Sequence, residues 1–434
     1  MALLNRRMNQ WYTDLKWRLR NHADRAANAP KREADKVARI RRELPDPANV
    51  APRRLLVDVS VIHKHDAGTG IQRVVRSIRE ELSLVVSPDV TVEHLVVRRL
   101  RDGYVTLDGQ PVEGGPDALF LGLDFATDAV FRSRHQLQRL RESGTPLWFV
   151  VHDVLPMSHP GWFTPASQLK YRRWMRTCAA LADGILCVSP DTARQVEDLL
   201  TRRYRRTDLP RIVTITPGSN ISPEDRSIGT DRLPRAAHLA PETFAQAVLI
   251  VGTLEPRKGH ADALDAFDLL WNEGHKVPLV LIGKVGWNTI ALQRRIRGHE
   301  QFGKLLFWFD HASDDELHAS YRHCRLTLVP SLAEGYGLPI DEALALGSPV
   351  LARDIPVFRR HAEGDVRYFP AGADPVDIAG AITAAIATHR PDRTLPVLRT
   401  WNDTAREIVQ ALGCERAHLP PEPLSRAGAQ AIAE

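Results

Sequence analysis

The chain has 434 residues, of which 43% are hydrophobic and 26% charged, a composition typical of globular proteins. A chain of this length exceeds a single ordinary hydrophobic core and predicts two domains. No apolar run reaches the ~18 residues that a membrane-spanning helix needs, and the short apolar stretch before Arg6 and Arg7 is unlike a signal peptide. We therefore expect neither an integral membrane protein nor a secreted one.

Four cysteines, Cys178, Cys187, Cys324 and Cys414, lie far apart and form no Cys-x-x-Cys pair. This spacing favours neither a disulfide framework nor a zinc site, and it indicates the reducing environment of the cytoplasm. No convincing Asp-x-Asp motif stands next to a predicted strand end, so we expect no bound metal.

The net charge of +5 is concentrated at the N-terminus, where residues 1–50 carry twelve Lys and Arg but six Asp and Glu. Trp11 and Trp17 alternate with basic residues in this segment, which we predict to be a basic helical extension over residues 1–52. One interpretation is contact with an anionic membrane on the inner face of the plasma membrane. The other is a solvated helix packed on the rest of the protein or on a partner. No recognition motif for nucleic acid accompanies the charge.

Strands alternate with helices from residue 53 onward, which predicts parallel sheets with helices on both faces. We expect strands at 55–62, 92–97, 118–122, 147–151, 185–189 and 211–215, and helices at 71–86, 165–182 and 191–203. The proline-rich stretch 221–244 is a predicted linker. A second series has strands at 247–252, 278–283, 305–309, 326–329 and 349–352. Helices are expected there at 260–273, 289–299, 313–322 and 339–346.

These patterns predict an α/β protein with two Rossmann-like, doubly wound domains that face a cleft. The N-terminal domain covers residues 53–220, the C-terminal domain residues 245–412, and a tail residues 413–434. In open α/β sheets, ligands bind at the carboxyl ends of the strands, so the loops that follow the strands are where we expect the site.

The stretch from Leu328 to Ala345 carries the strongest signal for function. A predicted strand runs into a turn bracketed by Gly335 and Gly337, and a helix then starts near Pro339. Glycines let a ligand approach the backbone, and the first amides of a helix are unpaired donors that suit a diphosphate. Glu334 and Glu342 flank this turn and are placed to bind different ends of one ligand. The alternative is an ordinary helix start with an acidic first turn.

Three further elements lie at predicted strand ends. Arg257 and Lys258 follow the strand at 247–252, and fixed cations of this kind stabilise negative charge on a leaving phosphate. His152 ends the strand at 147–151 and opens on the cleft. A small-residue loop with Thr69 and Gly70 precedes a helix, although glycine loops alone are weak evidence because turns use glycine anyway.

The spacing from Glu334 to Glu342 resembles the Glu-x7-Glu motif of retaining glycosyltransferases of family 4, which have the GT-B fold. The likeness continues in Gly347-Ser348-Pro349-Val350 and in the stretch before Lys258, which matches the lysine of a family Gly-Arg-x-x-x-x-Lys-Gly pattern. Thr253 stands where the family has an arginine. The sequence around Gly70 is similar to that of bacterial mannosyltransferases that build O-antigen and related polysaccharides. The resemblance covers residues 53–412 approximately.

The resemblance implies a role for each candidate residue. Glu334 and His152 would contact the donor sugar, Glu342 the ribose, and Arg257 and Lys258 the leaving diphosphate. The remaining donor-binding candidates share positions at strand ends or in the glycine-bracketed turn; they are Thr69, Gly70, Ser189, Gly218, Thr253, Gly335, Tyr336, Gly337 and Leu338.

The implied activity is a retaining hexosyl transfer from a nucleotide-sugar to a growing glycan or a lipid-linked oligosaccharide. GDP-mannose is the first expected donor, a GDP-linked deoxysugar the second, and no cofactor or metal is expected. The alternative on the same fold is a sugar-nucleotide epimerase or a phosphorylase. A nicotinamide-dependent oxidoreductase is disfavoured because residues 66–73 do not have Gly-x-Gly-x-x-Gly spacing.

Overall fold

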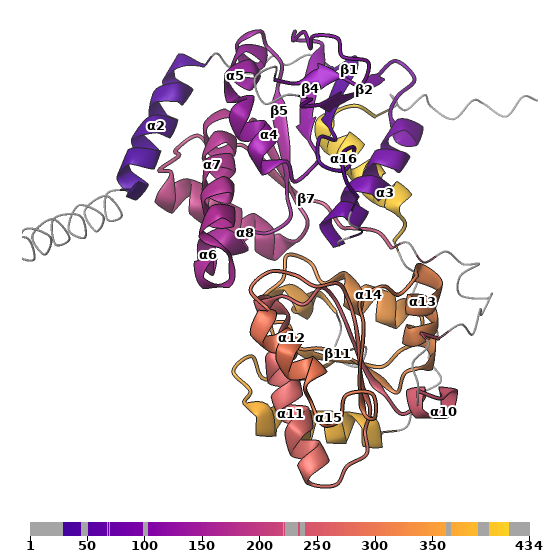
Figure 1. Cartoon of the computed structure of the whole chain (residues 1–434). Coiled ribbons are helices and arrows are strands. Elements are labelled where there is room, and N and C mark those ends of the chain that lie inside the picture. The colour runs from indigo at the N-terminus through magenta and orange to yellow at the C-terminus, as the bar shows by residue number, and fades with distance from the viewer. Residues whose placement is uncertain are drawn as a thin grey trace, which may run out of the picture.

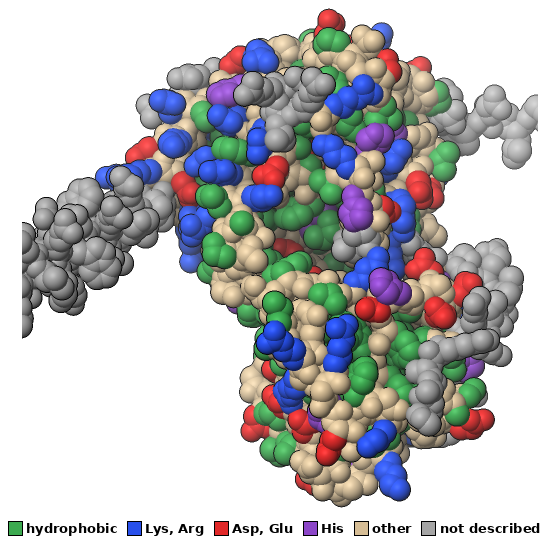
Figure 2. All heavy atoms as spheres, viewed as in Figure 1, with side chains coloured by type: hydrophobic (Ala, Val, Ile, Leu, Met, Phe, Trp, Pro, Cys, Tyr) green, Lys and Arg blue, Asp and Glu red, His purple; other side chains and the backbone are tan. Residues whose placement is uncertain are grey.

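The computed structural model describes residues 29–44, 51–66, 68, 70–98, 103–219, 221, 233–234, 239–361, 366–388 and 399–415. Two lobes lie one above the other, and each is built around its own sheet (Figure 1). The surface is hollowed close to the seam between the lobes, where hydrophobic side chains are visible (Figure 2). The predicted α/β class is confirmed.

The first sheet has the strand order β3-β2-β1-β4-β5-β6-β7. All neighbours pair in parallel except β3, which runs antiparallel to β2. Its strands are β1 (Arg54–Asp58), β2 (Thr91–Val96), β3 (Val105–Thr106), β4 (Ala118–Gly122), β5 (Leu147–Val151), β6 (Gly184–Cys187) and β7 (Arg211–Thr214). The order changes direction between β1 and β4, so their carboxyl ends open a crevice.

Helices cover both faces of this sheet because its buried strands present apolar side chains alternately to each side. Within β1, Leu56 joins one core, while Leu55 and Val57 join the other. The helices of this lobe are α3 (Gly70–Val85), α4 (Thr127–Arg132), α5 (Arg134–Glu142), α6 (Leu155–Ser158), α7 (Pro165–Leu181) and α8 (Pro190–Asp198). The helical turns at Pro160–Trp162 and Leu199–Arg203 complete it.

The second sheet has the order β10-β9-β8-β11-β12-β13 and is entirely parallel. This is the doubly wound order in which the reversal falls between the first and fourth strands, here β8 and β11. Its strands are β8 (Val248–Val251), β9 (Leu279–Ile282), β10 (Leu306–Phe309), β11 (Leu326–Val329), β12 (Val350–Arg353) and β13 (Val366–Phe369). Strands β3 and β13 are the two that the sequence did not predict.

The helices of the second lobe are α10 (Pro241–Phe244), α11 (His260–Asn272), α12 (Ile290–Arg297), α13 (Asp314–His323), α14 (Leu338–Ala345) and α15 (Pro375–Ala387). Short helical turns cover Pro256–Lys258 and Pro356–Arg360. Local signals explain several of the helix starts. Ser313 and Glu316 form a capping box at α13, and Asp374 and Asp377 form another at α15.

The last helix, α16 (Trp401–Leu412), returns to the first lobe, whereas α15 stays in the second (Figure 1). Ile408 and Leu412 are buried in the core that contains Leu55, and α16 packs along α3. Gly218 touches the start of α16, since a Cβ there would lie 2.5 Å from the Trp401 nitrogen. The prediction that the C-terminal domain extends to residue 412 is therefore wrong for residues 401–412. The apolar face of a helix can pack on any complementary core that the chain reaches, including one formed by an earlier part of the sequence.

Within the N-terminal extension, α2 (Ala29–Glu43) is packed on the first lobe. Ala34 and Val37 are buried against α7, and Glu33 accepts a hydrogen bond from Nη2 of Arg203 at 2.7 Å. This part of the extension matches the interpretation of a helix packed on protein. Residues 1–28 lie outside the described residues, and membrane contact through them stays a prediction. No helix of the described residues has the length and apolar character to cross a bilayer.

Candidate functional site

The candidate site forms where the loops after β8 and β11 meet, at the reversal point of the second sheet. The amide of Leu332 donates to the carbonyl of Arg257 at 2.7 Å, which ties the two loops together. A Cβ at Gly259 would lie 2.1 Å from the carbonyl oxygen of Pro330, so only glycine allows this approach. The same glycine has a φ of 69°, which glycine adopts without strain.

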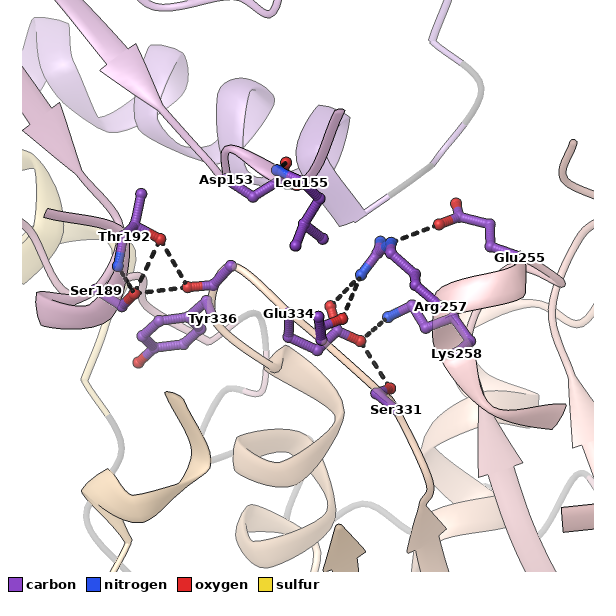
Figure 3. Close-up of polar contacts among 12 residues, drawn as sticks. Asp153, Leu155, Ser189, Thr192, Glu255, Arg257, Lys258, Ser331, Glu334 and Tyr336 are labelled. Carbon is purple, nitrogen blue, oxygen red and sulfur yellow. Dashed lines mark hydrogen bonds and ion pairs between the residues drawn. The ribbon is translucent and has the colours of Figure 1, made fainter. Parts of the chain in front are cut away.

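Glu334 is the centre of a compact charged group (Figure 3). Its carboxylate accepts hydrogen bonds from the guanidinium of Arg257, from Nζ of Lys258 at 2.5 Å and from the hydroxyl of Ser331 at 2.9 Å. Arg257 also donates through Nε to Glu255 at 2.7 Å. The structure thus brings together Glu334, Arg257 and Lys258 as predicted, and adds Ser331 and Glu255.

The charges at Glu334 determine its protonation. Burial by itself raises the pKa of this carboxyl, but Arg257 and Lys258 outweigh burial and hold the pKa at about 2. Glu334 is therefore a carboxylate near neutral pH and can accept hydrogen bonds but not act as an acid. Burial lowers the pKa of Arg257, while Glu334 and Glu255 overcome that effect and keep it above its usual value.

His152 reaches this group from the first domain through its backbone. A Cβ at Gly335 would lie 1.9 Å from the carbonyl oxygen of His152, so the turn after Glu334 rests directly on the end of β5. The His152 side chain is 6% exposed, and burial lowers its pKa to about 4, so the imidazole is neutral at pH 7. Among the described residues, Nε2 of His152 has no hydrogen-bond partner.

Asp153, the residue after His152, forms hydrogen bonds with α6 and α7 of the first domain. Its carboxylate accepts from the amide of Leu155 at 3.0 Å, and its carbonyl accepts from the hydroxyl of Tyr171 at 2.6 Å. Burial raises the pKa of this carboxyl, and the nearby Arg257 opposes the rise. Asp153 thus shapes the start of α6 in the first domain.

Ser189 holds the turn from the first domain. Its hydroxyl donates to the carbonyl of Gly335 at 2.7 Å, and Thr192 donates to the same carbonyl at 3.2 Å (Figure 3). Ser189 also caps α8 by accepting from the amide of Thr192. The predicted donor-binding serine is therefore engaged with Gly335, and contact with a ligand stays a prediction.

The rest of the glycine-bracketed turn also lies between the domains. Tyr336 and Leu338 pack against the first-domain core, and the Tyr336 hydroxyl donates to the carbonyl of Pro217 at 3.3 Å. Gly337 caps α14 with a φ of 99°, and a Cβ there would lie 2.4 Å from the Phe358 ring. Glycine is thus required at 337 both by its backbone conformation and by its surroundings.

Glu342 lies in the second turn of α14 and is 8% exposed. One of its oxygens accepts from Arg73 of α3 at 2.6 Å, and the other accepts from the hydroxyl of Tyr321 at 2.9 Å. The structure does not bring Glu342 into contact with the group around Glu334. Arg73 was missed as a site residue, although it stands three positions after Gly70 in a stretch that the sequence singled out.

The remaining predicted residues occupy different surroundings. Gly70 is exposed and begins α3, and no atom lies within 4 Å of a Cβ built on it. Thr253 is half-buried beside Gly286. Gly218 lies against the start of α16, and this close approach alone explains why position 218 is a glycine. Thr69 lies outside the described residues.

Two comparisons with known proteins bear on the second domain and on the whole chain. Residues 235–394 match the family Glycosyl transferases group 1. The serotype-specific mannosyltransferase WbdA of Escherichia coli is 35% identical over 379 residues, which are 83% of this chain and 46% of that protein. The chain therefore contains a group 1 glycosyltransferase domain.

Other relatives are consistent with this group 1 glycosyltransferase domain. The O-antigen chain mannosyltransferase B of Escherichia coli is 29% identical over 53% of this chain and 57% of its own length. The chain spans about half the length of the curated relatives it matches. Anabaena HepE, solved in complex with UDP and glucose, has a TM-score of 0.52 at 16% identity and covers 83% of this chain and 94% of its own. That likeness confirms the predicted GT-B arrangement of the two Rossmann-like domains.

Proposed function

We propose that this chain transfers mannose, with retention of configuration, from a nucleotide-sugar to a glycan acceptor of the O-antigen type, as a family 4 enzyme. The observation that carries this proposal is the group in which Glu334 binds Arg257 and Lys258 at the reversal point of the second sheet. The likeness to proteins named mannosyltransferases over 83% of the chain supports mannose as the sugar. GDP-mannose is the first donor to test, and a GDP-linked deoxysugar is the second.

The proposed reaction breaks the bond between C1 of the sugar and the diphosphate oxygen, and the bonding electrons leave with the diphosphate. A hydroxyl of the acceptor attacks C1 from the same face, and its proton passes to the leaving phosphate oxygen. The Glu334 carboxylate is held by two cations, which makes it a poor covalent nucleophile. Same-face attack therefore fits this group better than a covalent intermediate.

Glu334 and His152 have different parts in this proposal. The carboxylate of Glu334 accepts hydrogen bonds from sugar hydroxyls and keeps its charge because its pKa is about 2. The imidazole of His152 is neutral at pH 7, and its Nε2, which has no partner among the described residues, would bind a hydroxyl of the donor sugar. Glu342 would bind the ribose of the nucleotide, and α14 directs its N-terminal amides and positive dipole end toward the diphosphate. No cofactor or metal is needed in this proposal.

The test is a transfer assay on the full chain with GDP-, UDP-, ADP- and dTDP-sugars and a mannose oligosaccharide acceptor. We expect thermal stabilisation by a GDP-sugar, because a ligand that binds only the native state raises its stability. We also expect an α-linked product from an α-linked donor, read by NMR of the anomeric proton. Conversion of the donor without an acceptor would instead identify an epimerase, and a product of inverted configuration would refute retention.

A further inference from the structure

A group of aromatic side chains joins the two domains at one end of the seam. His159, Trp162 and Phe163 follow α6 in the first domain, and Trp287 precedes α12 in the second. The rings of His159 and Trp162 stack with centroids 4.2 Å apart and planes 5° from parallel. Phe163 stacks on Trp287 with centroids 5.5 Å apart. We call these four residues the aromatic ledge.

Two hydrogen bonds fix the aromatic ledge across the domains. Nε1 of Trp287 donates to the carbonyl of Trp162 at 2.9 Å, and the side-chain amide of Asn288 donates to the same carbonyl at 3.1 Å. Asn288 has a φ of 57°, which asparagine adopts more readily than most residues. The orientation of Trp287 is therefore set by its own hydrogen bond and by its stacking on Phe163.

The aromatic ledge faces solvent although its rings are apolar. His159 is exposed, Trp287 is 38% exposed, and the neighbouring Val285 and Ile290 are 46% and 66% exposed. Apolar side chains that gather at the surface in this way mark a binding site, whereas single exposed ones need no explanation.

Polar groups lie beside the exposed rings. The hydroxyl of Ser158 and Nδ1 of His159 form a hydrogen bond at 2.9 Å, and Asn288 adjoins Trp287. A pyranose has an apolar face, whose C–H bonds pack on the electron-rich face of an aromatic ring, and hydroxyls around its edge. Rings next to hydrogen-bonding groups therefore fit a sugar better than an acyl chain, which has no hydroxyls to bind.

The aromatic ledge adjoins the group around Glu334 on the side of the second domain. A Cβ at Gly286, directly before Trp287, would lie 2.9 Å from Cγ of Glu255. Glu255 accepts from Arg257, which also binds Glu334. On the side of the first domain, the ledge follows the end of β5 and α6 in the chain. The loops that carry the ledge are thus continuous with the candidate site.

The pair of Arg73 and Glu342 lies at the other end of the seam. Arg73 belongs to α3 and approaches Asp314 of α13 at 3.6 Å as well as Glu342 of α14 at 2.6 Å. In Figure 1, α3 and α13 lie at one end of the seam, and α6 and α12 lie at the other. If the ribose binds Glu342 and the sugar binds Glu334, the ledge lies on the sugar side of the donor.

We propose that the aromatic ledge binds the glycan acceptor, with pyranose rings stacked on Trp287 and His159. This inference rests on the proposed function, in which an acceptor hydroxyl must reach C1 of the sugar held at Glu334. The ledge lies where that acceptor approaches without crossing the nucleotide. A glycan chain presents several pyranose faces in series, so a longer acceptor gains more from the ledge than a short one. Because both domains supply rings, the ledge is complete only when the domains meet.

The experiment compares Trp287→Ala, Trp287→Phe and Phe302→Ala in the full chain. W287F keeps a ring for stacking but lacks the indole N–H that binds Trp162. Phe302 is 39% exposed and precedes β10, at the amino end of the second sheet, so F302A is a matched control for the loss of one exposed ring. Mannose transfer from GDP-mannose to an α-mannose disaccharide and tetrasaccharide gives the KM for each acceptor. Calorimetry measures the affinity for GDP alone.

We expect W287A to raise the KM for the tetrasaccharide roughly tenfold, as the loss of an aromatic contact does, and the KM for the disaccharide less. The affinity for GDP should not change. W287F should keep most of the tetrasaccharide affinity, and F302A should leave both acceptors unaffected.

An unchanged KM for the tetrasaccharide in W287A overturns the acceptor role and leaves the proposed function standing. The same effect in F302A would overturn the role as well. Equal losses in W287A and W287F, with weaker GDP binding in both, would show that Trp287 only holds the domains together. If the wild type transfers mannose to neither acceptor, the proposed function fails, and the role of the aromatic ledge fails with it.

Discussion

The guanidinium of Arg73 donates to the carboxylate of Glu342 at 2.6 Å, and this ion pair joins α3 of the first domain to α14 of the second. Tyr321 donates to the other oxygen of the same carboxylate. The interaction with Glu342, despite burial, raises the pKa of Arg73. A nucleotide whose ribose binds Glu342 would therefore meet a cation of the opposite domain at the same place.

We expect Arg73→Met to lower the free energy of unfolding by about 1–3 kcal/mol, because a buried carboxylate would keep only the hydrogen bond from Tyr321. The double variant R73M with Glu342→Gln should recover much of that loss, since the amide carries no charge. Urea denaturation measures the free energy of unfolding of both variants. Arg76→Met is the control on the same helix, because its pair with Asp66 is 38% and 29% exposed and is expected to contribute under about 1 kcal/mol. Equal effects of R73M and R76M would contradict the importance of the domain-crossing pair.

Glu334→Gln should reduce turnover by roughly 100-fold or more, because the neutral amide binds sugar hydroxyls less strongly and no longer organises its two cations. The variant should also be less stable than wild type, since Arg257 and Lys258 would face each other without their shared carboxylate. Steady-state transfer assays and thermal denaturation check both effects. Turnover within threefold of wild type would remove Glu334 from the proposed mechanism.

Acid stability provides a separate test of the Glu334 group. Its pKa falls from an ordinary value of 4.5 to about 2 in the folded chain, so the unfolded state takes up the proton first. The stabilisation by Glu334 is present above pH 4.5 and is lost as the pH falls from about 4.5 to about 2. The difference in unfolding free energy between wild type and E334Q should therefore shrink over that range. A constant difference from pH 5 to pH 2.5 would show that Glu334 is not paired in solution.

Gly335→Ala should reduce turnover strongly, because a Cβ would lie 1.9 Å from the carbonyl oxygen of His152 and push the turn away from the first domain. Gly380→Ala is the matched control, since no atom lies within 4 Å of its Cβ and it stands within α15. That control should stabilise the chain by about 0.5–1 kcal/mol, as alanine does in a helix. Comparable activity of the two variants would mean that the contact with His152 is not needed.

The imidazole of His152 should stay neutral well below its usual titration range. Burial lowers its pKa from 6.5 to about 4, so the unfolded chain binds the proton first, and the contribution of His152 to stability is lost between those two values as the pH falls. NMR of the imidazole C2 proton, assigned with His152→Asn, should show no titration above pH 5. A midpoint near 6.5 would indicate that His152 is exposed to solvent in solution.

Local pattern was enough to predict most of the strands and helices. The two strands that escaped prediction were β3, with two residues, and β13, whose VRYF sequence has a mixed pattern. The helices α4, α5, α6 and α10 were also not predicted. The placement of α16 also escaped, because its apolar face is compatible with either core and nothing local selects between them. The boundaries predicted for the linker and the tail stay predictions. Cys414, at the predicted start of the tail, is buried in the first-domain core.

From the sequence alone, Glu334, Arg257 and Lys258 are predicted to follow strands of a parallel sheet, and such strands place their carboxyl ends at one edge. Which charges meet depends on tertiary packing. Arg257 stands close to Thr253 in the sequence, yet its guanidinium is bound to Glu255 and Glu334. Arg73, by contrast, reaches across the seam between the domains to Glu342. Ion pairs form between residues that packing brings within a few ångströms, and sequence separation carries no information about that distance.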